Sequence, residues 1–396
     1  MRMVLTAEKL WNGTKLLDHP MVVIEDGRIA SIAPRTGSEI PAQSRVLDYP
    51  GATLAPAFLD VHIHGAADHD VMEATAEALN AIGRFLASHG TGSYLATTVT
   101  ASLDATLRAL SELAKLLSQP PGATEAQARP IGIHLEGPFL SHLKRGVQPP
   151  EYLLAPDIDL FDRLFEAAEG HIRLMTLAPE LPGAVELAAH ATSRGVRVSV
   201  GHSNATAAET RAAIAAGAVS ATHIFNAMRP LDHREPGILG VVLTTDSLFA
   251  ELICDGIHTA PELVKLWWRA KGPERAILVT DAISATGMPD GEYQLGGFAD
   301  GFSVQVANGK ATAGGVLAGS VLTLDRALTN FIEFTGAPLD HALRLVTANP
   351  AAMTGLGAQA GELAVGQPAN LVAVDSAGRL LASIQNGQPI ANSQTR

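Results

Sequence analysis

Short apolar runs recur along the middle of the chain, and longer stretches rich in Ala and Leu follow them. Runs of this length predict strands that are buried on both faces, and the stretches between them predict helices. The eight predicted strands are FLDVHIHG (58–65), SYLATTV (93–99), IGIHLEG (131–137), IRLMTLAP (172–179), VRVSVGHS (196–203), SATHIFNAM (220–228), FAELICDG (249–256) and AILVTDAI (276–283). Eight βα units predict an α/β fold with a closed (β/α)8 TIM-type barrel, and a doubly wound open sheet is the alternative.

The two ends of the chain have a different pattern. Residues 1–55 and 361–390 alternate short β-like runs with Gly turns. We therefore expect a small β domain formed by residues 1–55 and 356–396, with the barrel occupying 56–355. The Gly- and Pro-rich stretch 284–318 predicts an insertion or lid after the last barrel strand.

Composition narrows the classes of partner. The chain has 396 residues, 47% of them hydrophobic, and 28 basic against 40 acidic residues give a net charge of -12. Without a Lys/Arg cluster, nucleic acid is not an expected partner. The start of the sequence lacks the apolar stretch of a signal peptide, and no apolar run approaches 18 residues. These features predict a cytoplasmic protein without a membrane partner.

Several predicted strands end in residues that can ionise or bind a metal, at the carboxyl end of the barrel where active sites form. His62 and His64 are two apart on one strand, so both side chains point the same way. Their alternative role is hydrogen bonding in the core, and Glu136 could instead be part of a buried ion pair. The remaining candidates are His202, His223, Asp255 and Asp281. A single cysteine, Cys254, excludes a thiolate cluster, so His and carboxylate ligands are expected.

The segments DVHIHG, HLEGPFL, GHSNAT, THIFNAMRPLDHREPG, DGIH, LVTDAISATGMPDGEYQLGG and LAGSVLTLDRA occur in this order. Together they resemble the N-acetylglucosamine-6-phosphate deacetylase family of the amidohydrolase superfamily, from about residue 50 to the end. The resemblance implies a (β/α)8 barrel with a small β-sandwich built from both chain ends. It also implies hydrolysis of the acetamide of N-acetylglucosamine 6-phosphate to glucosamine 6-phosphate and acetate, in amino-sugar metabolism.

The resemblance also assigns roles to residues. Glu136, His202 and His223 match the ligands of a divalent metal, and Asp281 matches the catalytic aspartate, although an Asp here could also cap the following segment. Arg234 and His258 match phosphate-binding positions, and in this family the arginine reaches the site of the neighbouring subunit, which implies a homodimer. Further positions that match substrate contacts are Val147, Gln148, Asn226, Ala227, Asp255, Gly256, Ile257, Leu317, Ala318 and Gly319.

The complete His62, His64 pair predicts capacity for a second metal ion, bridged to the first through Glu136. We expect one or two divalent ions per subunit, with zinc or iron favoured and manganese or cobalt acceptable to the same ligands.

The chain departs from the family pattern at Gln148, which occupies the position of a substrate-contacting His. The side-chain amide of Gln can donate and accept hydrogen bonds, but unlike His it cannot become a cation near neutral pH. One alternative is therefore a deacetylase for a related sugar phosphate such as N-acetylgalactosamine 6-phosphate. Independently of Gln148, the chain could be another amidohydrolase, or a non-catalytic scaffold on the same fold, because a fold does not determine a function.

Overall fold

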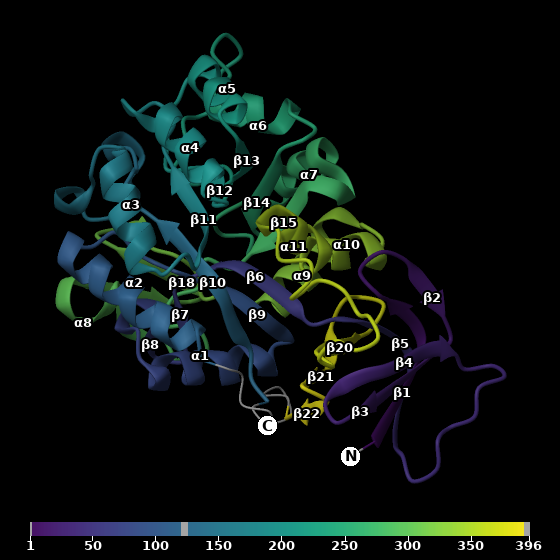
Figure 1. Ribbon diagram of the computed structural model, residues 1–396. Helices are drawn as coiled ribbons and strands as arrows, with labels where there is room; N and C mark the ends of the chain where they lie inside the picture. The colour runs from purple at the N-terminus through teal and green to yellow at the C-terminus, as the bar shows by residue number, and fades with distance from the viewer. Residues whose placement is uncertain (1, 120–125, 392–396) are drawn as a thin grey trace.

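The computed structural model describes residues 2–119 and 126–391, and its centre is an eight-stranded parallel sheet (Figure 1). The sheet order is β15-β14-β13-β12-β11-β10-β9-β6, so each strand neighbours the next barrel strand along the chain. The strands are β6 (Phe58–Ile63), β9 (Thr91–Thr97), β10 (Arg129–Glu136), β11 (Ile172–Leu177), β12 (Arg197–Val200), β13 (Ala218–Ala221), β14 (Phe249–Ile253) and β15 (Ala276–Val279). All eight predicted strands are present, although β13 overlaps its predicted range only at residues 220–221, because the chain turns after Ala221.

Backbone contacts beyond the ends of β15 and β6 bring the two edges of this sheet together. Ile63 and Ala282 form a parallel bridge. The backbone N–H of Asp281 donates to the His62 carbonyl at 2.9 Å, and that of His64 donates to the Ala282 carbonyl at 2.8 Å. The (β/α)8 prediction is confirmed, and the open sheet is excluded.

Helices cover the outside of the barrel, and polar residues begin several of them. The side chain of Thr206 accepts from the backbone N–H of Glu209, whose carboxylate accepts from Thr206 in return, a reciprocal cap that starts α5. The helices are α1 (Ala76–Ser88), α2 (Leu103–Leu117), α3 (Ile158–Ala167), α4 (Ala184–Ser193), α5 (Ala207–Ala215), α6 (Gly237–Thr244), α7 (Pro261–Arg275), α9 (Leu324–Thr335), α10 (Leu339–Leu345) and α11 (Ala348–Thr354). Every residue of β6 and β9 is buried, as expected for strands enclosed by helices.

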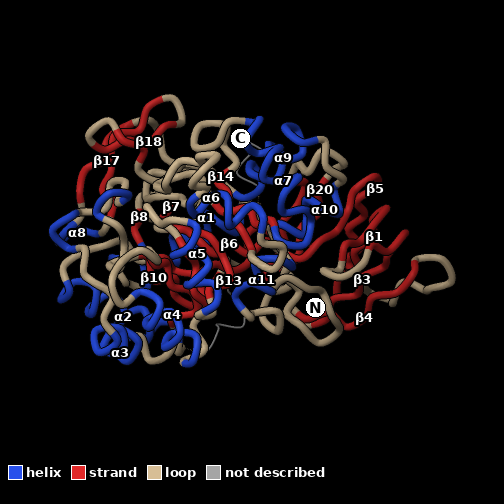
Figure 2. Tube along the Cα trace, turned by 90° about the horizontal axis from the view of Figure 1, so that it is seen from above, coloured by secondary structure: helices blue, strands red, loops and turns tan. Residues whose placement is uncertain are grey.

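A second sheet combines both ends of the chain and lies beside the barrel (Figure 2). Its order is β22-β21-β20-β5-β1-β3-β4, with β2 paired to β1, and β20 lies antiparallel to β5. The strands are β1 (Arg2–Trp11), β2 (Leu16–Asp18), β3 (Pro20–Glu25), β4 (Arg28–Pro34), β5 (Arg45–Pro56), β20 (Leu371–Val374), β21 (Leu380–Gln385) and β22 (Gln388–Ile390). A separate cluster that includes Leu5, Leu54 and Leu371 forms its apolar core. Division into domains at the expected boundaries stays a prediction.

The stretch that follows β15 forms a small antiparallel sheet of its own. Its strands are β16 (Gly291–Leu295), β17 (Phe302–Ala307), β18 (Lys310–Ala313) and β19 (Val316–Leu317), with the short helix α8 (Gly297–Asp300) between the first two. Leu295 and Val304 pack in a cluster with Val99, near the carboxyl end of β9. A hairpin, β7 (Gly65–Ala66) and β8 (His69–Asp70), follows β6.

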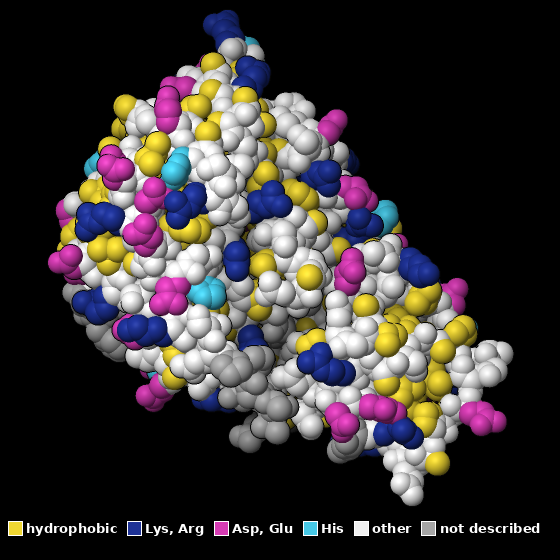
Figure 3. Space-filling view, viewed as in Figure 1, with side chains coloured by type: hydrophobic (Ala, Val, Ile, Leu, Met, Phe, Trp, Pro, Cys, Tyr) yellow, Lys and Arg dark blue, Asp and Glu magenta, His cyan; other side chains and the backbone are white. Residues whose placement is uncertain are grey.

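Charged side chains of both signs alternate over the face visible in Figure 3, where basic residues form no continuous patch. None of the helices in residues 2–119 and 126–391 is long and apolar enough to cross a membrane.

Candidate metal centre and active site

Six ionisable side chains from five strand ends converge in the mouth of the barrel. Glu136 is the last residue of β10, and Asp281 follows β15 by two positions. All six are buried, with exposed fractions from 0% for His62 to 9% for Asp281. The six residues are His62, His64, Glu136, His202, His223 and Asp281.

Glu136, His202 and His223 form the first group of possible metal ligands. Its Oε1 atom lies 3.3 Å from Nε2 of His202 and 3.3 Å from Nε2 of His223. These two nitrogens are 3.0 Å apart. One carboxylate and two imidazoles therefore direct their ligand atoms at a common point.

The second group shares the same carboxylate. Nε2 of His62 lies 3.2 Å from Glu136 Oε1, and Nε2 of His64 lies 3.3 Å from Glu136 Oε2. The Oδ1 atom of Asp281 is 3.1 Å from Nε2 of His64. Glu136 therefore stands between two sets of ligand atoms, in the position that a bridging ligand requires.

The backbone around these side chains is strained at three of the six positions. The φ angles of His202, His223 and Asp281 are 45°, 27° and 51°, in the left-handed region that residues with a Cβ atom avoid. Each such residue costs about 1 to 3 kcal/mol and persists where surrounding structure imposes it. Strain at three converging ligand-type residues is typical of a functional site.

Hydrogen bonds on the outer side of two imidazoles indicate which nitrogen carries the proton. Nδ1 of His64 lies 3.2 Å from the Thr97 carbonyl, and Nδ1 of His202 lies 3.1 Å from the Lys144 carbonyl. Because a carbonyl only accepts, Nδ1 keeps its proton when the ring binds a metal ion, and the Nε2 lone pair then faces the cluster. Lone pairs and carboxylate oxygens at such short range repel one another unless a cation lies among them, so the residues fit a divalent metal ion.

The electrostatics of the cluster also favour positive charge. Burial opposes ionisation of Glu136, but the nearby imidazoles, His62 above all, outweigh it and hold the pKa of this carboxyl well below its usual range. The same balance lowers the pKa of Asp281 to about 2. Both carboxylates are therefore anionic at neutral pH and attract a cation.

A cavity of about 360 Å³ opens onto this cluster. Its wall includes His64, Glu136, His202, His223 and Asp281, together with the predicted residues Val147, Gln148, Asn226, Ala227, His258, Leu317 and Gly319. The remaining lining residues, Val99, Leu143, Lys144, Gly146, Leu295 and Val316, were not predicted from the sequence. Lys144 adds a cation to the wall, and the insertion adds Leu295 and Val316.

Other predicted residues lie behind the cavity or away from it. Asp255 accepts from Nδ1 of His258 at 2.7 Å and from the backbone N–H groups of Ile257 and His258. It thus fixes the His258 ring, while Gly256, Ile257 and Ala318 are not among the lining residues. Arg234 lies in an exposed loop and does not line the cavity of its own subunit.

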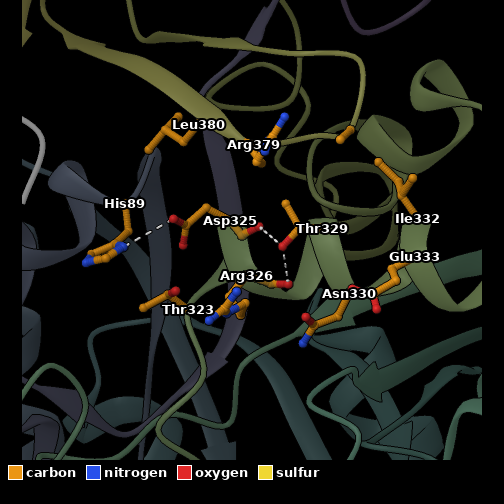
Figure 4. A pocket seen from close by; sticks show the side chains of 11 residues that line it. His89, Thr323, Asp325, Arg326, Thr329, Asn330, Ile332, Glu333, Arg379 and Leu380 are labelled. Carbon is orange, nitrogen blue, oxygen red and sulfur yellow. Dashed lines mark hydrogen bonds and ion pairs between the residues drawn. The ribbon is translucent and has the colours of Figure 1, made fainter. Parts of the chain in front are cut away.

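A larger cavity of about 740 Å³ lies elsewhere, between α9 and β21 (Figure 4). Nδ1 of His89 is 3.3 Å from Oδ2 of Asp325 there, and both signs of charge line the wall through Arg326, Glu333 and Arg379. None of the predicted site residues lines this cavity.

Comparison with known proteins identifies the family. The amidohydrolase family matches residues 53–393. The chain belongs to the amidohydrolase family. Among curated members, N-acetylglucosamine-6-phosphate deacetylase of Lysinibacillus sphaericus is 39% identical over 355 residues, covering 89% of each chain. N-acetylgalactosamine-6-phosphate deacetylase of Escherichia coli O157:H7 is 39% identical over 374 residues, covering 94% of this chain and 95% of the relative.

A solved structure extends the likeness of this amidohydrolase to three dimensions. A mutant of N-acetyl-D-glucosamine-6-phosphate deacetylase from Mycobacterium smegmatis, in complex with N-acetyl-D-glucosamine 6-phosphate, superposes with a TM-score of 0.89. It is 36% identical, and the match covers 98% of this chain and 99% of that one. The family resemblance inferred from the sequence motifs is confirmed.

Proposed function

We propose that this amidohydrolase is a metal-dependent deacetylase that hydrolyses N-acetylglucosamine 6-phosphate to glucosamine 6-phosphate and acetate. The observation that carries the proposal is the buried Glu136, His202 and His223 group, which shares one cavity with Asp281 and His258. Relatives with this activity in their names, at 34–39% identity over most of the chain, support it.

Glu136, His202 and His223 would hold the first divalent ion. When bound, the ion supplies a Lewis acid for the amide carbonyl and makes water more acidic. Asp281, ionised at neutral pH, accepts a proton from the water as the water oxygen bonds to the carbonyl carbon. Asp281 then returns this proton to the sugar nitrogen as the C–N bond breaks, and acetate and the free amine leave.

Other residues of the wall would position the substrate. His258, held by Asp255, faces the cavity and is a candidate donor to the phosphate. The apolar side chains of Val99, Leu295 and Val316 line one part of the cavity, where they would contact apolar parts of the substrate. Asn226, Ala227 and Gly319 remain candidate contacts of the sugar.

Arg234 would complete the phosphate site from a second subunit. It lies in an exposed loop that also contains Leu231, whose exposed fraction is 54%, and it does not line the cavity. An exposed apolar side chain and an arginine in one exposed loop are typical of a subunit interface, and the guanidinium fork suits phosphate. We therefore include a homodimer in the proposal.

The second group of ligand atoms gives the enzyme capacity for a second ion between His62, His64 and Glu136. The Glu136, His202, His223 position would be the tighter of the two. Zinc and iron suit these ligands best, and manganese or cobalt can replace them.

N-acetylgalactosamine 6-phosphate is a second candidate substrate. Two observations favour it: the relative from Escherichia coli O157:H7 and Gln148 in place of the family His. The test is a deacetylation assay on both sugar phosphates and on unphosphorylated N-acetylglucosamine, after removing metal and restoring single metals. We expect the highest kcat/KM on N-acetylglucosamine 6-phosphate, and no turnover on any of these substrates would contradict the proposed function.

A further inference from the structure

Glu251 is a fully buried carboxylate that no step of the proposed reaction uses. It lies in the middle of β14, in the sequence FAELI, with an exposed fraction of 0%. Its neighbours Ala250 and Leu252 are apolar and equally buried. Neither carboxylate oxygen of Glu251 has a hydrogen bond from the described residues. An isolated charge in such a position is unfavourable, so a compensating charge is expected nearby.

The nearest ionisable group to Glu251 belongs to the candidate metal centre. Oε2 of Glu251 lies 3.5 Å from Nδ1 of His62, and the other ring nitrogen of His62 faces Glu136. The imidazole thus stands between a carboxylate behind it and the ligand group in front. A carboxylate behind a ligating His is a common arrangement, because it fixes the ring and leaves the opposite nitrogen unprotonated.

His62 differs in this respect from His64 and His202, whose outer nitrogens are hydrogen-bonded. His64 and His202 each place Nδ1 on a neutral backbone carbonyl. Of the six cluster residues, His62 alone has a carboxylate oxygen of another described residue outside the cluster within 4 Å of a ring nitrogen. The negative charge of Glu251 therefore acts on the second ligand group, which contains His62 and His64, and not on the His202 and His223 ligands of the first.

We propose that Glu251 is a positioning residue for the second metal site. It holds His62 with Nε2 directed toward His64 and Glu136, and its charge offsets part of the charge of a second divalent cation. This inference rests on the two-ion capacity proposed above. It does not involve the first ion or the role of Asp281.

The test compares Glu251→Gln, which keeps the shape and an acceptor oxygen, with Glu251→Leu, which removes both acceptor and charge. Asp325→Asn is the matched control, because Asp325 is also a buried carboxylate beside a histidine, His89, but lies in the other cavity (Figure 4). His62→Asn serves as the reference for loss of the second site. Metal-free protein is titrated with Mn²⁺ by calorimetry, and electron paramagnetic resonance monitors coupling between two bound Mn²⁺ ions.

For Glu251→Leu we expect the weaker Mn²⁺ dissociation constant to rise on the order of 10- to 100-fold, with the tighter one unchanged. The signal of coupled ions should fade as it does in His62→Asn. Glu251→Gln should fall between parent and Glu251→Leu, and Asp325→Asn should keep both ions.

Two results would overturn the inference. One is parental affinity at both sites in Glu251→Leu while His62→Asn loses its second ion. The other is a parent that binds a single Mn²⁺. Deacetylation of N-acetylglucosamine 6-phosphate by protein with only the tighter site filled is measured separately, so failure here is distinguishable from failure of the proposed function.

Discussion

The side-chain amide of Gln148 connects Glu136 to the chain after β9. Its Nε2 donates to Oε2 of Glu136 at 3.0 Å, and its Oε1 accepts from the backbone N–H of Thr100 at 2.9 Å. With an exposed fraction of 5%, Gln148 has little freedom to reorient. The residue that departs from the family pattern therefore holds the carboxylate shared by both ligand groups, as well as lining the cavity.

Gln148→Leu should loosen Glu136 and weaken both catalysis and metal binding. We expect kcat/KM to fall roughly 10- to 100-fold, as is usual when a partner of a metal ligand is removed. The tighter metal dissociation constant should rise in parallel. Unchanged metal binding would show that the Glu136 contact is incidental.

Gln148→His tests whether the departure changes specificity. We expect less than a tenfold change in kcat/KM on N-acetylglucosamine 6-phosphate, because Gln148 already satisfies the carboxylate. The variant is compared with the parent on the 6-phosphates of N-acetylglucosamine and N-acetylgalactosamine. A rise of tenfold or more on the gluco substrate, about 1.4 kcal/mol of transition-state stabilisation, would instead mark Gln148 as a handicap or a specificity change.

Asp281→Asn should fold and bind metal but lose turnover. Asn tolerates the left-handed backbone at this position, where φ is 51°, so the local structure should persist. An amide cannot accept the proton of water, and we expect kcat to fall on the order of 10² to 10⁴. Single-turnover kinetics with metal analysis checks this, and near-normal kcat with full metal content would remove Asp281 from the proton-transfer role.

The barrel and most of the candidate site could be predicted because each strand is a distinct apolar run and several runs end in a ligand-type residue. Glu251 was not predicted as a site residue because it lies inside a strand and not at its end, although a charged residue within the apolar run FAELI was a visible signal. Leu143 and Lys144 lie in a short 3-10 helix, His142–Lys144, in the connection after β10, and the path of this connection depends on tertiary contacts. Val316 reaches the cavity from an insertion that starts after β15, a proximity without a local sequence signal.

The double variant His62→Asn/His64→Asn tests the metal count. Its two amides cannot replace the imidazole ligands of the second group, while Glu136, His202 and His223 remain. Elemental analysis after saturation with Zn²⁺ and removal of unbound Zn²⁺ should give two ions for the parent and one for the variant. Equal metal content in the two proteins would eliminate the second site.

Lys271 predicts a pH-dependent contribution to stability far from the active site. Lys271 has an exposed fraction of 5%, and its ammonium donates to the Thr245 and Val242 carbonyls at 2.7 and 3.0 Å. Burial lowers the pKa of Lys271 to about 8, with nearby Asp246 opposing this.

The unfolded value is about 10.4, so between pH 8 and 10.4 the unfolded chain binds more protons, and stability from this group rises with pH. The free energy of unfolding is measured in urea for the parent and for Lys271→Met at pH 7.5 and at pH 10. The difference, parent minus variant, should be about 2 to 3 kcal/mol more positive at pH 10 than at pH 7.5. A pH-independent difference would mean that the carbonyls keep the ammonium charged.

Arg234→Ala should reduce activity on the phosphorylated substrate selectively. Loss of a guanidinium that binds phosphate removes a strong charge-assisted contact, so we expect KM for N-acetylglucosamine 6-phosphate to rise on the order of 10- to 100-fold. Activity on unphosphorylated N-acetylglucosamine should change little. Equal losses on both substrates would argue against a phosphate contact.

Mixing Arg234→Ala with Asp281→Asn decides whether Arg234 acts across a subunit interface. In a mixed dimer, the active site of the Arg234→Ala chain keeps its own Asp281 and receives an intact arginine from its partner, whereas the other site lacks both. Random reassociation of equal amounts makes half of the dimers mixed, so about a quarter of all sites should regain activity. If Arg234 instead serves its own subunit, each site of the mixed dimer lacks one required group and no activity returns. Re-mixing two samples of the same variant controls for the exchange procedure, and sedimentation measures the dimer directly.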